Sequence, residues 1–254
     1  MVASGSLRRL GPVWLGTEET PPPVAAALRL GAKLTCINAL RIHGVWVLRD
    51  EGVHLATLRG AGVGTGANTT QIRLHHYVHS WPDDEPILPV ELALQHAARC
   101  QGPEAAAIAL ESALERRLID QGAANDILQG IPQKLRRDIG PIYPRSGSGT
   151  ETRVRRYLQH LGVKVVPQWQ ATRDIRTDLR VGDRLVIECD SREHHTEEES
   201  YLRDRSRDQV LMGMGMIVLR LTWEDVVLHW ERTKKLLRRL IRDGVHRRPR
   251  TARA

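Results

Sequence analysis

The stretch "RLVIECDSREHHTEEE" (residues 184–199) decides the fold of the C-terminal half of the chain. It begins with a short apolar run at residues 185–187, which is typical of a strand buried in a core. Polar residues that can carry chemistry follow at once: Glu188, Asp190, His194 and His195. A core strand that ends in acids and imidazoles points to a functional site rather than to packing.

The surrounding sequence predicts a mixed sheet. "RTDLRV" (176–181) and "RLVIEC" (184–189) are two strands joined tightly at Gly182 and Asp183. Ser148 and Glu151 have capping-box spacing, which opens a helix before the strands. Helical and strand patterns then alternate to the end of the chain. Residues 146–254 are therefore expected to form an α/β domain, a mixed sheet flanked by helices in the order α-β-β-β-α-β-α.

Two acids lie where they cost stability. Asp178 lies inside a strand and Glu188 at the end of the most apolar strand. A buried carboxylate needs an ion pair, a proton or a metal ion. A two-residue connection between the strands would put Asp178 and Glu188 on opposite faces, whereas a three-residue connection or a bulge would put them on the same face. A shared metal site requires the second arrangement.

Clustered carboxylates repel each other, so a divalent cation is their natural partner, and oxygen ligands suit Mg²⁺. Mg²⁺ or Mn²⁺ assists phosphodiester cleavage by polarising a phosphoryl oxygen and by lowering the pKa of the attacking water. The acids therefore predict metal-dependent hydrolysis at the end of this strand.

Residues 146–240 resemble a domain family of unknown function related to the very-short-patch-repair endonucleases, within the PD-(D/E)xK, restriction-endonuclease-like superfamily. The shared features are Glu151, Asp178, Glu-x-Asp at 188–190, His194-His195, Asp204-Arg205-x-Arg207-Asp208 and Thr222-Trp223.

The resemblance implies a role for each residue of the site. Asp178 and Glu188 would bind the metal together with the Cys189 carbonyl, and Glu151 would orient the site. One histidine of the pair, with His195 preferred, would act as general base or steady the leaving group. The expected catalytic set is Glu151, Asp178, Glu188, Asp190 and His195.

The sequence departs from the superfamily at one position. Asp190 stands where a lysine is usual, so the role of that lysine passes to the histidines or to Arg192. On the following helix, residues 204–208 have the spacing of ion pairs on a solvated face, although Arg205 and Arg207 could also contact phosphate.

The N-terminal half is expected to be a mixed α+β module of residues 1–145, ending in the linker "PIYPRSGSGT" (141–150). Residues 34–45 predict a short helix, 45–59 a hairpin, and 72–80 a strand. Residues 89–118 and 121–138 have helical patterns. "LTCINALRIHGV" and the Ala-rich segment from Glu91 resemble the domain of abortive-infection type IV antitoxins, which implies a regulatory or recruiting module.

The net charge of +8 is uneven, since residues 146–254 carry 23 basic and 16 acidic side chains against 15 and 14 in residues 1–145. A basic half beside a neutral half favours DNA as a partner, and a solvated basic tail is the alternative. The candidate DNA contacts are Arg192, His194, Arg205, Arg207, Arg238, Arg239, Arg247 and Arg248.

The three cysteines, Cys36, Cys100 and Cys189, show no CxxC spacing, so the sequence predicts small buried side chains rather than a zinc site. His75, His76 and His79 could bind a metal, but the pattern favours a polar edge face. No apolar run has the length of a membrane span, and a cytoplasmic location is expected.

These patterns predict an Mg²⁺-dependent DNA endonuclease. A DNA-binding regulator of antitoxin type that does not cleave is the alternative, and a third is an interaction module that does not bind DNA. A second copy of the chain and a protein encoded in the same operon stay open as partners.

Overall fold

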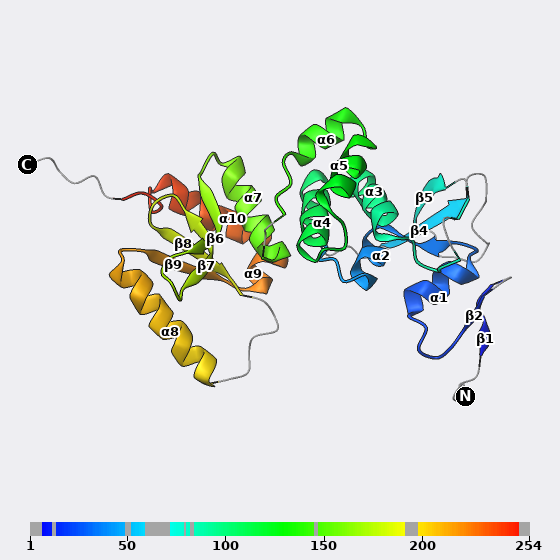
Figure 1. Cartoon of the computed structure of the whole chain (residues 1–254), viewed down its shortest axis with the longest axis horizontal. Coiled ribbons are helices and arrows are strands. Elements are labelled where there is room, and N and C mark those ends of the chain that lie inside the picture. The colour runs from blue at the N-terminus through cyan, green and yellow to red at the C-terminus, as the bar shows by residue number, and fades with distance from the viewer. Residues whose placement is uncertain are drawn as a thin grey trace, which may run out of the picture. The chain divides into compact units, whose positions relative to one another are not determined.

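The computed structural model of the chain describes residues 7–11, 14–48, 52–58, 72–78, 80–81, 84–144, 147–190 and 198–248, apart from the side chains of residues 76–78 and 198–205. The chain divides into two compact units, Met1–Ile142 and Tyr143–Ala254. Both units mix helices and strands (Figure 1). Among the described residues, no helix is long and apolar enough to cross a membrane.

The N-terminal unit combines short strands with a group of helices. Its elements are β1 (Arg8–Arg9), β2 (Leu15–Gly16), α1 (Pro22–Arg29), β3 (Lys33–Leu34), α2 (Cys36–Ile42), β4 (Val53–Leu58), β5 (Ile72–Val78), α3 (Val90–Cys100), α4 (Pro103–Glu115), α5 (Gln121–Gln129) and α6 (Gln133–Ile139). The strand order of the larger sheet is β3-β4-β5, with β3 and β4 antiparallel and β4 and β5 parallel.

The hairpin predicted for residues 45–59 is wrong. Residues 45–48 have no regular structure, and β4 pairs with β3 and β5 instead. Gly44 ends α2 with a φ of +80°, and the Val45 N–H then donates to the Leu40 carbonyl. Val45 and Val47 pack into the helical core. The alternation of apolar residues at positions 45 and 47 therefore reflects contact with helices and not with a partner strand.

The helical patterns after residue 89 are confirmed, but each is divided into two helices. Gly102 and Pro103 separate α3 from α4, and Pro103 occupies the first turn of α4, where its missing N–H costs nothing. Gly130 and Pro132 separate α5 from α6 in the same way. Alanine and leucine side chains from α2, α3, α4 and α5 form the largest core of this unit.

The C-terminal unit has the predicted order, with its last helix divided in two. Its elements are α7 (Gly149–His160), β6 (Val165–Gln170), β7 (Arg176–Val181), β8 (Leu185–Cys189), α8 (Glu198–Gly213), β9 (Ile217–Leu221), α9 (Trp223–Val227) and α10 (Trp230–Arg242). The sheet order is β6-β7-β8-β9, antiparallel except for the parallel pair β8 and β9, which α8 connects. The expected mixed α/β architecture is confirmed.

Helices cover both faces of this sheet. Val154 and Leu158 of α7 and Leu237 of α10 pack on one face, against Leu179 and Ile187. On the other face, Leu211 of α8 packs against Val186. Figure 1 shows α7 and α10 on one side of the sheet and α8 on the other.

The connection between β7 and β8 has three residues. Val181 pairs with Leu185 and Leu179 with Ile187, so Gly182, Asp183 and Arg184 form the turn. Gly182 has a φ of +59°, and the Asp183 N–H donates to the His246 carbonyl at 2.8 Å. This register puts Asp178 next to Glu188 in the sheet.

Candidate active site

Asp178 and Glu188 are joined through the backbone where β7 and β8 separate. The Asp178 N–H donates to Glu188 Oε2 at 3.1 Å, and the Cys189 N–H donates to Asp178 Oδ2 at 2.8 Å. Each carboxylate thus accepts an N–H from the opposite strand, as a ladder carbonyl would do. The two acids occupy neighbouring positions, as the same-face alternative requires.

Burial raises the pKa of both acids. The pKa of Glu188 rises to about 7, first because the side chain is removed from water and second because Asp178 is close. Burial also raises the pKa of Asp178, whereas the Cys189 N–H and a hydrogen bond with Glu188 lower it. The two carboxylates form a coupled pair in which full ionisation is costly without a cation.

Glu151 reaches the sheet from the start of α7. Ser148 Oγ accepts the Glu151 N–H at 3.2 Å and caps the helix. The Glu151 carboxylate accepts a hydrogen bond of 2.6 Å from Gln168 Nε2 on β6. Gln168 has a φ of +48°, a strained value for a residue other than glycine, and such strain is common at functional sites.

Asp190 lies just after β8 in a network with β9 and α8. Its N–H donates to the Leu221 carbonyl, and its carboxylate lies 3.6 Å from the Arg220 guanidinium. Arg220 also contacts Asp208 at 3.0 Å. Arg220 therefore links the acid that replaces the expected lysine to helix α8.

Arg207 extends from α8 to the acid pair. Its Nη2 lies 3.4 Å from Glu188 Oε1 and donates to the Arg176 carbonyl at 2.8 Å. The prediction of ion pairs within residues 204–208 stays open, because the side chains of Asp204 and Arg205 lie outside the described residues. Arg207 and Asp208 both pair with residues of the sheet. They do so because α8 packs on the face of the sheet that carries Glu188.

All four predicted acids lie near one buried thiol. The pKa of the Cys189 thiol is raised well above its usual range, first by burial and then by the charges of Asp178, Glu151, Glu188 and Asp190. Elements far apart in the sequence therefore bring these acids to one end of the sheet.

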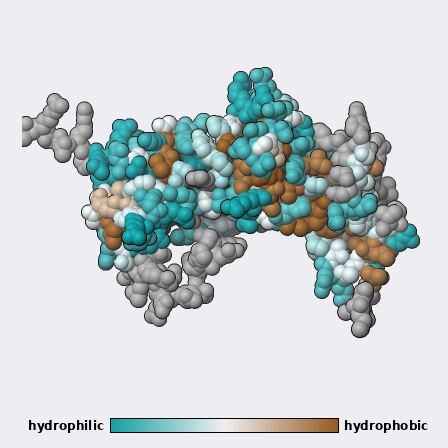
Figure 2. All heavy atoms as spheres, viewed as in Figure 1, coloured by the Kyte–Doolittle hydropathy of each residue, from teal (hydrophilic) through white to brown (hydrophobic). Residues whose placement is uncertain are grey.

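The remaining predicted residues fall into two groups. Arg192, His194 and His195 lie outside the described residues, as does the side chain of Arg205. Arg238, Arg239, Arg247 and Arg248 are exposed on α10 and the segment after it. Because α10 packs on the face opposite α8, these arginines form a basic surface separate from Arg207. The face of this unit seen in Figure 2 is mostly hydrophilic.

Sequence reasoning missed Gln168, Arg220 and Gly147. A Cβ at Gly147 would lie 2.5 Å from Gln168 Nε2 and 2.7 Å from Glu151 Oε1, so a side chain at this position would displace the ends of both residues. No local pattern reveals these contacts, because they join residues of α7, β6 and β9 through the fold. The partial exception is Arg220, a charged residue in an otherwise apolar strand.

One comparison with known proteins finds a family for the C-terminal half. Residues 151–241 match the family REase_MTES_1575. The C-terminal half therefore contains a restriction-endonuclease-like domain, and such a domain suggests nuclease activity with DNA as substrate. No curated protein and no solved structure matches the chain. The family match does not reach residues 1–142, where the resemblance to antitoxins stays a prediction.

Proposed function

We propose that the C-terminal unit is a metal-dependent endonuclease that hydrolyses phosphodiester bonds in DNA. The observation that carries the proposal is the pair of half-buried Asp178 and buried Glu188, joined by two hydrogen bonds from backbone N–H groups to carboxylates where the strands separate. A protein that only held DNA would gain nothing from acids directed at phosphate. The family match of residues 151–241 supports the same activity.

The acid pair fits a hard divalent cation, Mg²⁺ or Mn²⁺. Burial raises the pKa of both carboxylates, and the charge of Asp178 raises the pKa of Glu188 further, so a cation would favour the ionised form of both acids. Asp178 and Glu188 would hold it with the carbonyl of Cys189. When bound, such an ion polarises the phosphoryl oxygen and makes water a better nucleophile.

The residues around the acid pair hold it in place and neutralise its charge. Gln168 fixes the Glu151 carboxylate, which lets Glu151 orient water or the ion. Arg207 and Arg220 bring positive charge to Glu188 and Asp190, and they can stabilise the charge that the usual lysine would stabilise. His195 is the candidate for proton transfer, and the exposed arginines of α10 are candidates for non-specific contacts with phosphate.

The test is plasmid cleavage by the full chain with Mg²⁺ or Mn²⁺, compared with Asp178→Asn and Glu188→Gln. Both substitutions keep the shape and remove a charge, so we expect folded proteins that do not cleave. Asp174→Asn is the matched control, because Asp174 is exposed and lies only four residues before Asp178. This variant should cleave like the wild type.

Two results would contradict the proposal. If the wild type binds DNA but never cleaves it with either ion, the non-cleaving regulator is the better description. If Asp178→Asn and Glu188→Gln unfold while Asp174→Asn folds, the acids are structural partners of Arg207 and the backbone, and do not bind metal.

A further inference from the structure

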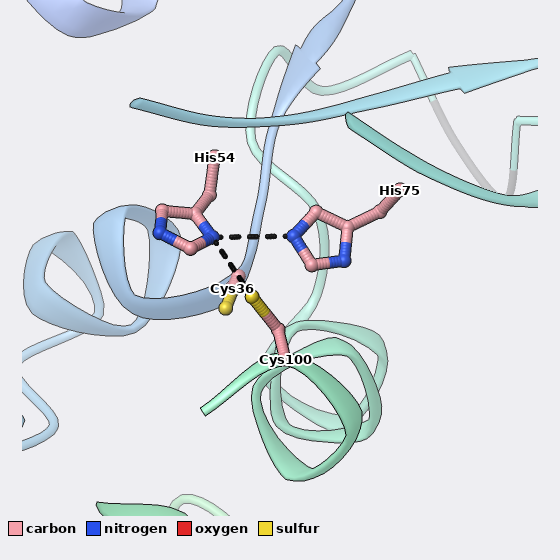
Figure 3. A group of neighbouring side chains, drawn as sticks. All are labelled: Cys36, His54, His75 and Cys100. Carbon is pink, nitrogen blue, oxygen red and sulfur yellow. Dashed lines mark hydrogen bonds between the residues drawn. The ribbon is translucent and has the colours of Figure 1, made fainter. Parts of the chain in front are cut away.

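A second group of metal-ligand side chains lies in the N-terminal unit, remote in sequence from the acids. Cys36, His54, His75 and Cys100 each offer one ligand atom, and all four atoms lie within 4.8 Å of one another. Cys36, His54 and His75 are buried, and Cys100 is half-buried. Figure 3 shows the four side chains directed at one point from two helices and two strands.

Two of the six separations between the ligand atoms are close to those of a tetrahedral zinc site, and none exceeds 4.8 Å. Zn–N bonds of about 2.0–2.1 Å and Zn–S bonds of about 2.3 Å place neighbouring ligand atoms about 3.3–3.8 Å apart around a tetrahedron. His54 Nδ1 lies 3.2 Å from His75 Nε2, and Cys100 Sγ lies 3.6 Å from His54 Nδ1. Two sulfurs and two imidazole nitrogens are a ligand set typical of zinc.

The fold holds the four side chains in place through the backbone. The Thr35 N–H donates to the His54 carbonyl at 3.0 Å, and the His54 N–H donates to Asn38 Oδ1 at 2.8 Å. These two bonds fix the first turn of α2 against β4. His54 pairs with Arg73, two residues before His75, so both histidines lie on one face of the parallel pair.

Polar and aromatic side chains contact the proposed ligands and help to hold them in position, as hydrogen-bonding neighbours do for metal ligands. The Gln101 amide and the Arg73 guanidinium lie 3.7 and 4.0 Å from Cys100 Sγ, where they favour a thiolate. The ring of His96 stacks on His75 with centroids 4.8 Å apart, and its Nδ1 lies 2.7 Å from Thr35 Oγ1.

Cys36 carries backbone strain. Its φ is +52°, in the left-handed region that residues other than glycine seldom adopt. It is the first residue of α2, directly after the N-cap Thr35. Strained values of this kind persist where the surrounding structure uses them, as at ligand sites.

We propose that Cys36, His54, His75 and Cys100 bind one zinc ion. Four protein ligands leave no open position, so the site is structural and not catalytic. The ion would connect α2 and α3 to β4 and to β5, which pairs only with β4 among the described strands. This proposal departs from the sequence-based prediction that the cysteines are only small buried side chains. The assignment of His75 to a polar edge face is wrong, because His75 is buried, whereas the side chain of His76 and all of His79 lie outside the described residues.

The test begins with the metal content of the full chain, expressed without a histidine tag and dialysed before elemental analysis. We expect about one zinc per chain. Cys36→Ser, His75→Ala and Cys100→Ser should each lose most of it. Cys189→Ala and His160→Ala are matched controls, because Cys189 lies in the other unit and His160 is exposed, and both should retain zinc.

A second measurement uses wild-type protein, so that it does not depend on whether the ligand variants fold. Wild-type protein grown with Co²⁺ should show thiolate-to-cobalt charge-transfer bands and the visible bands of a tetrahedral ion. Asp178→Asn should keep both zinc and the cobalt spectrum, which separates this site from the nuclease site. If Asp178→Asn lost the metal, the ion would belong to the acids and the proposal would be wrong.

Two further results would overturn the zinc site. One is wild-type protein without zinc and without a cobalt spectrum. The other is a mass spectrum, taken after alkylation without reductant, in which Cys36 and Cys100 are joined as a disulfide. In the structure both cysteines are free thiols.

Discussion

The backbone N–H of Asp178 donates to the carboxylate of Glu188 at 3.1 Å, across the point where β7 and β8 separate. Residue 178 thus supplies both an acid and a donor that holds its partner acid. The relationship depends on the three-residue turn, because a shift of one residue would move Glu188 to the other face.

The first prediction concerns pH and stability without metal. The pKa of Glu188 is raised from 4.5 to about 7 in the folded chain. Between these values the folded state binds more protons than the unfolded state, so its stability should fall as pH rises and then level off above about 7. Glu188→Gln should reduce this fall in melting experiments with a chelator. Asp174→Asn should retain it, and an equal fall in Glu188→Gln would refute the assignment.

The second prediction concerns Arg207. Its charge lowers the pKa of Asp178 and Glu188, against the effect of burial. Arg207→Ala should therefore raise both values and shift the acidic limb of the cleavage profile to higher pH, measured as kcat/KM over about pH 5.5 to 9. Arg207→Lys keeps the positive charge, so its profile should lie closer to that of the wild type. A profile that keeps its position in Arg207→Ala would show that the 3.4 Å contact does not tune the site.

The third prediction uses the space at Gly147. The methyl group of Gly147→Ala would meet Gln168 Nε2 and the Glu151 carboxylate, so it must displace that pair. We expect kcat to fall roughly tenfold or more, which corresponds to about 1.4 kcal/mol, while the affinity for DNA holds. Gly213→Ala is the control, since nothing lies within 4 Å of its added Cβ. Equal rates for the two variants would exclude a role for the position of Glu151.

The fourth prediction concerns the basic surface. Replacing Arg247 and Arg248 with glutamine should flatten the slope of log affinity against log salt by up to about 1.8, since each phosphate contact contributes about 0.9. Arg8→Gln with Arg9→Gln is the matched control in the N-terminal unit, where both arginines are exposed. An unchanged slope in the first variant would mean that Arg247 and Arg248 are only solvated.

Point substitutions are a cleaner test here than deletion of residues 245–254. The His246 carbonyl accepts the Asp183 N–H, and His246 lies against Gly182 in the turn between β7 and β8. Val245 packs on the core of the unit. Deletion would therefore release the turn that sets the register of Asp178 and Glu188, and would not only remove charge.

The order of elements in the C-terminal unit could be read from the sequence. Apolar runs, glycine turns and the Ser148 cap are local signals, and each follows from the period of a strand or helix. The acids at the end of β8 could also be predicted from the sequence, because a charged residue that follows an apolar run is a local signal. The hairpin expected at residues 45–59 failed because alternation does not say whether a strand or a helix lies opposite.

Contacts between elements were decided by the tertiary structure alone. Whether Asp178 faces Glu188 depends on one residue of turn length, which the Asp183–His246 hydrogen bond and the φ of Gly182 fix. Cys36, His54, His75 and Cys100 follow no spacing rule, since they meet only when α2, β4, β5 and α3 pack together. Local sequence determines the period and ends of each element, whereas register and convergence depend on packing between segments far apart in the chain, which no local pattern encodes.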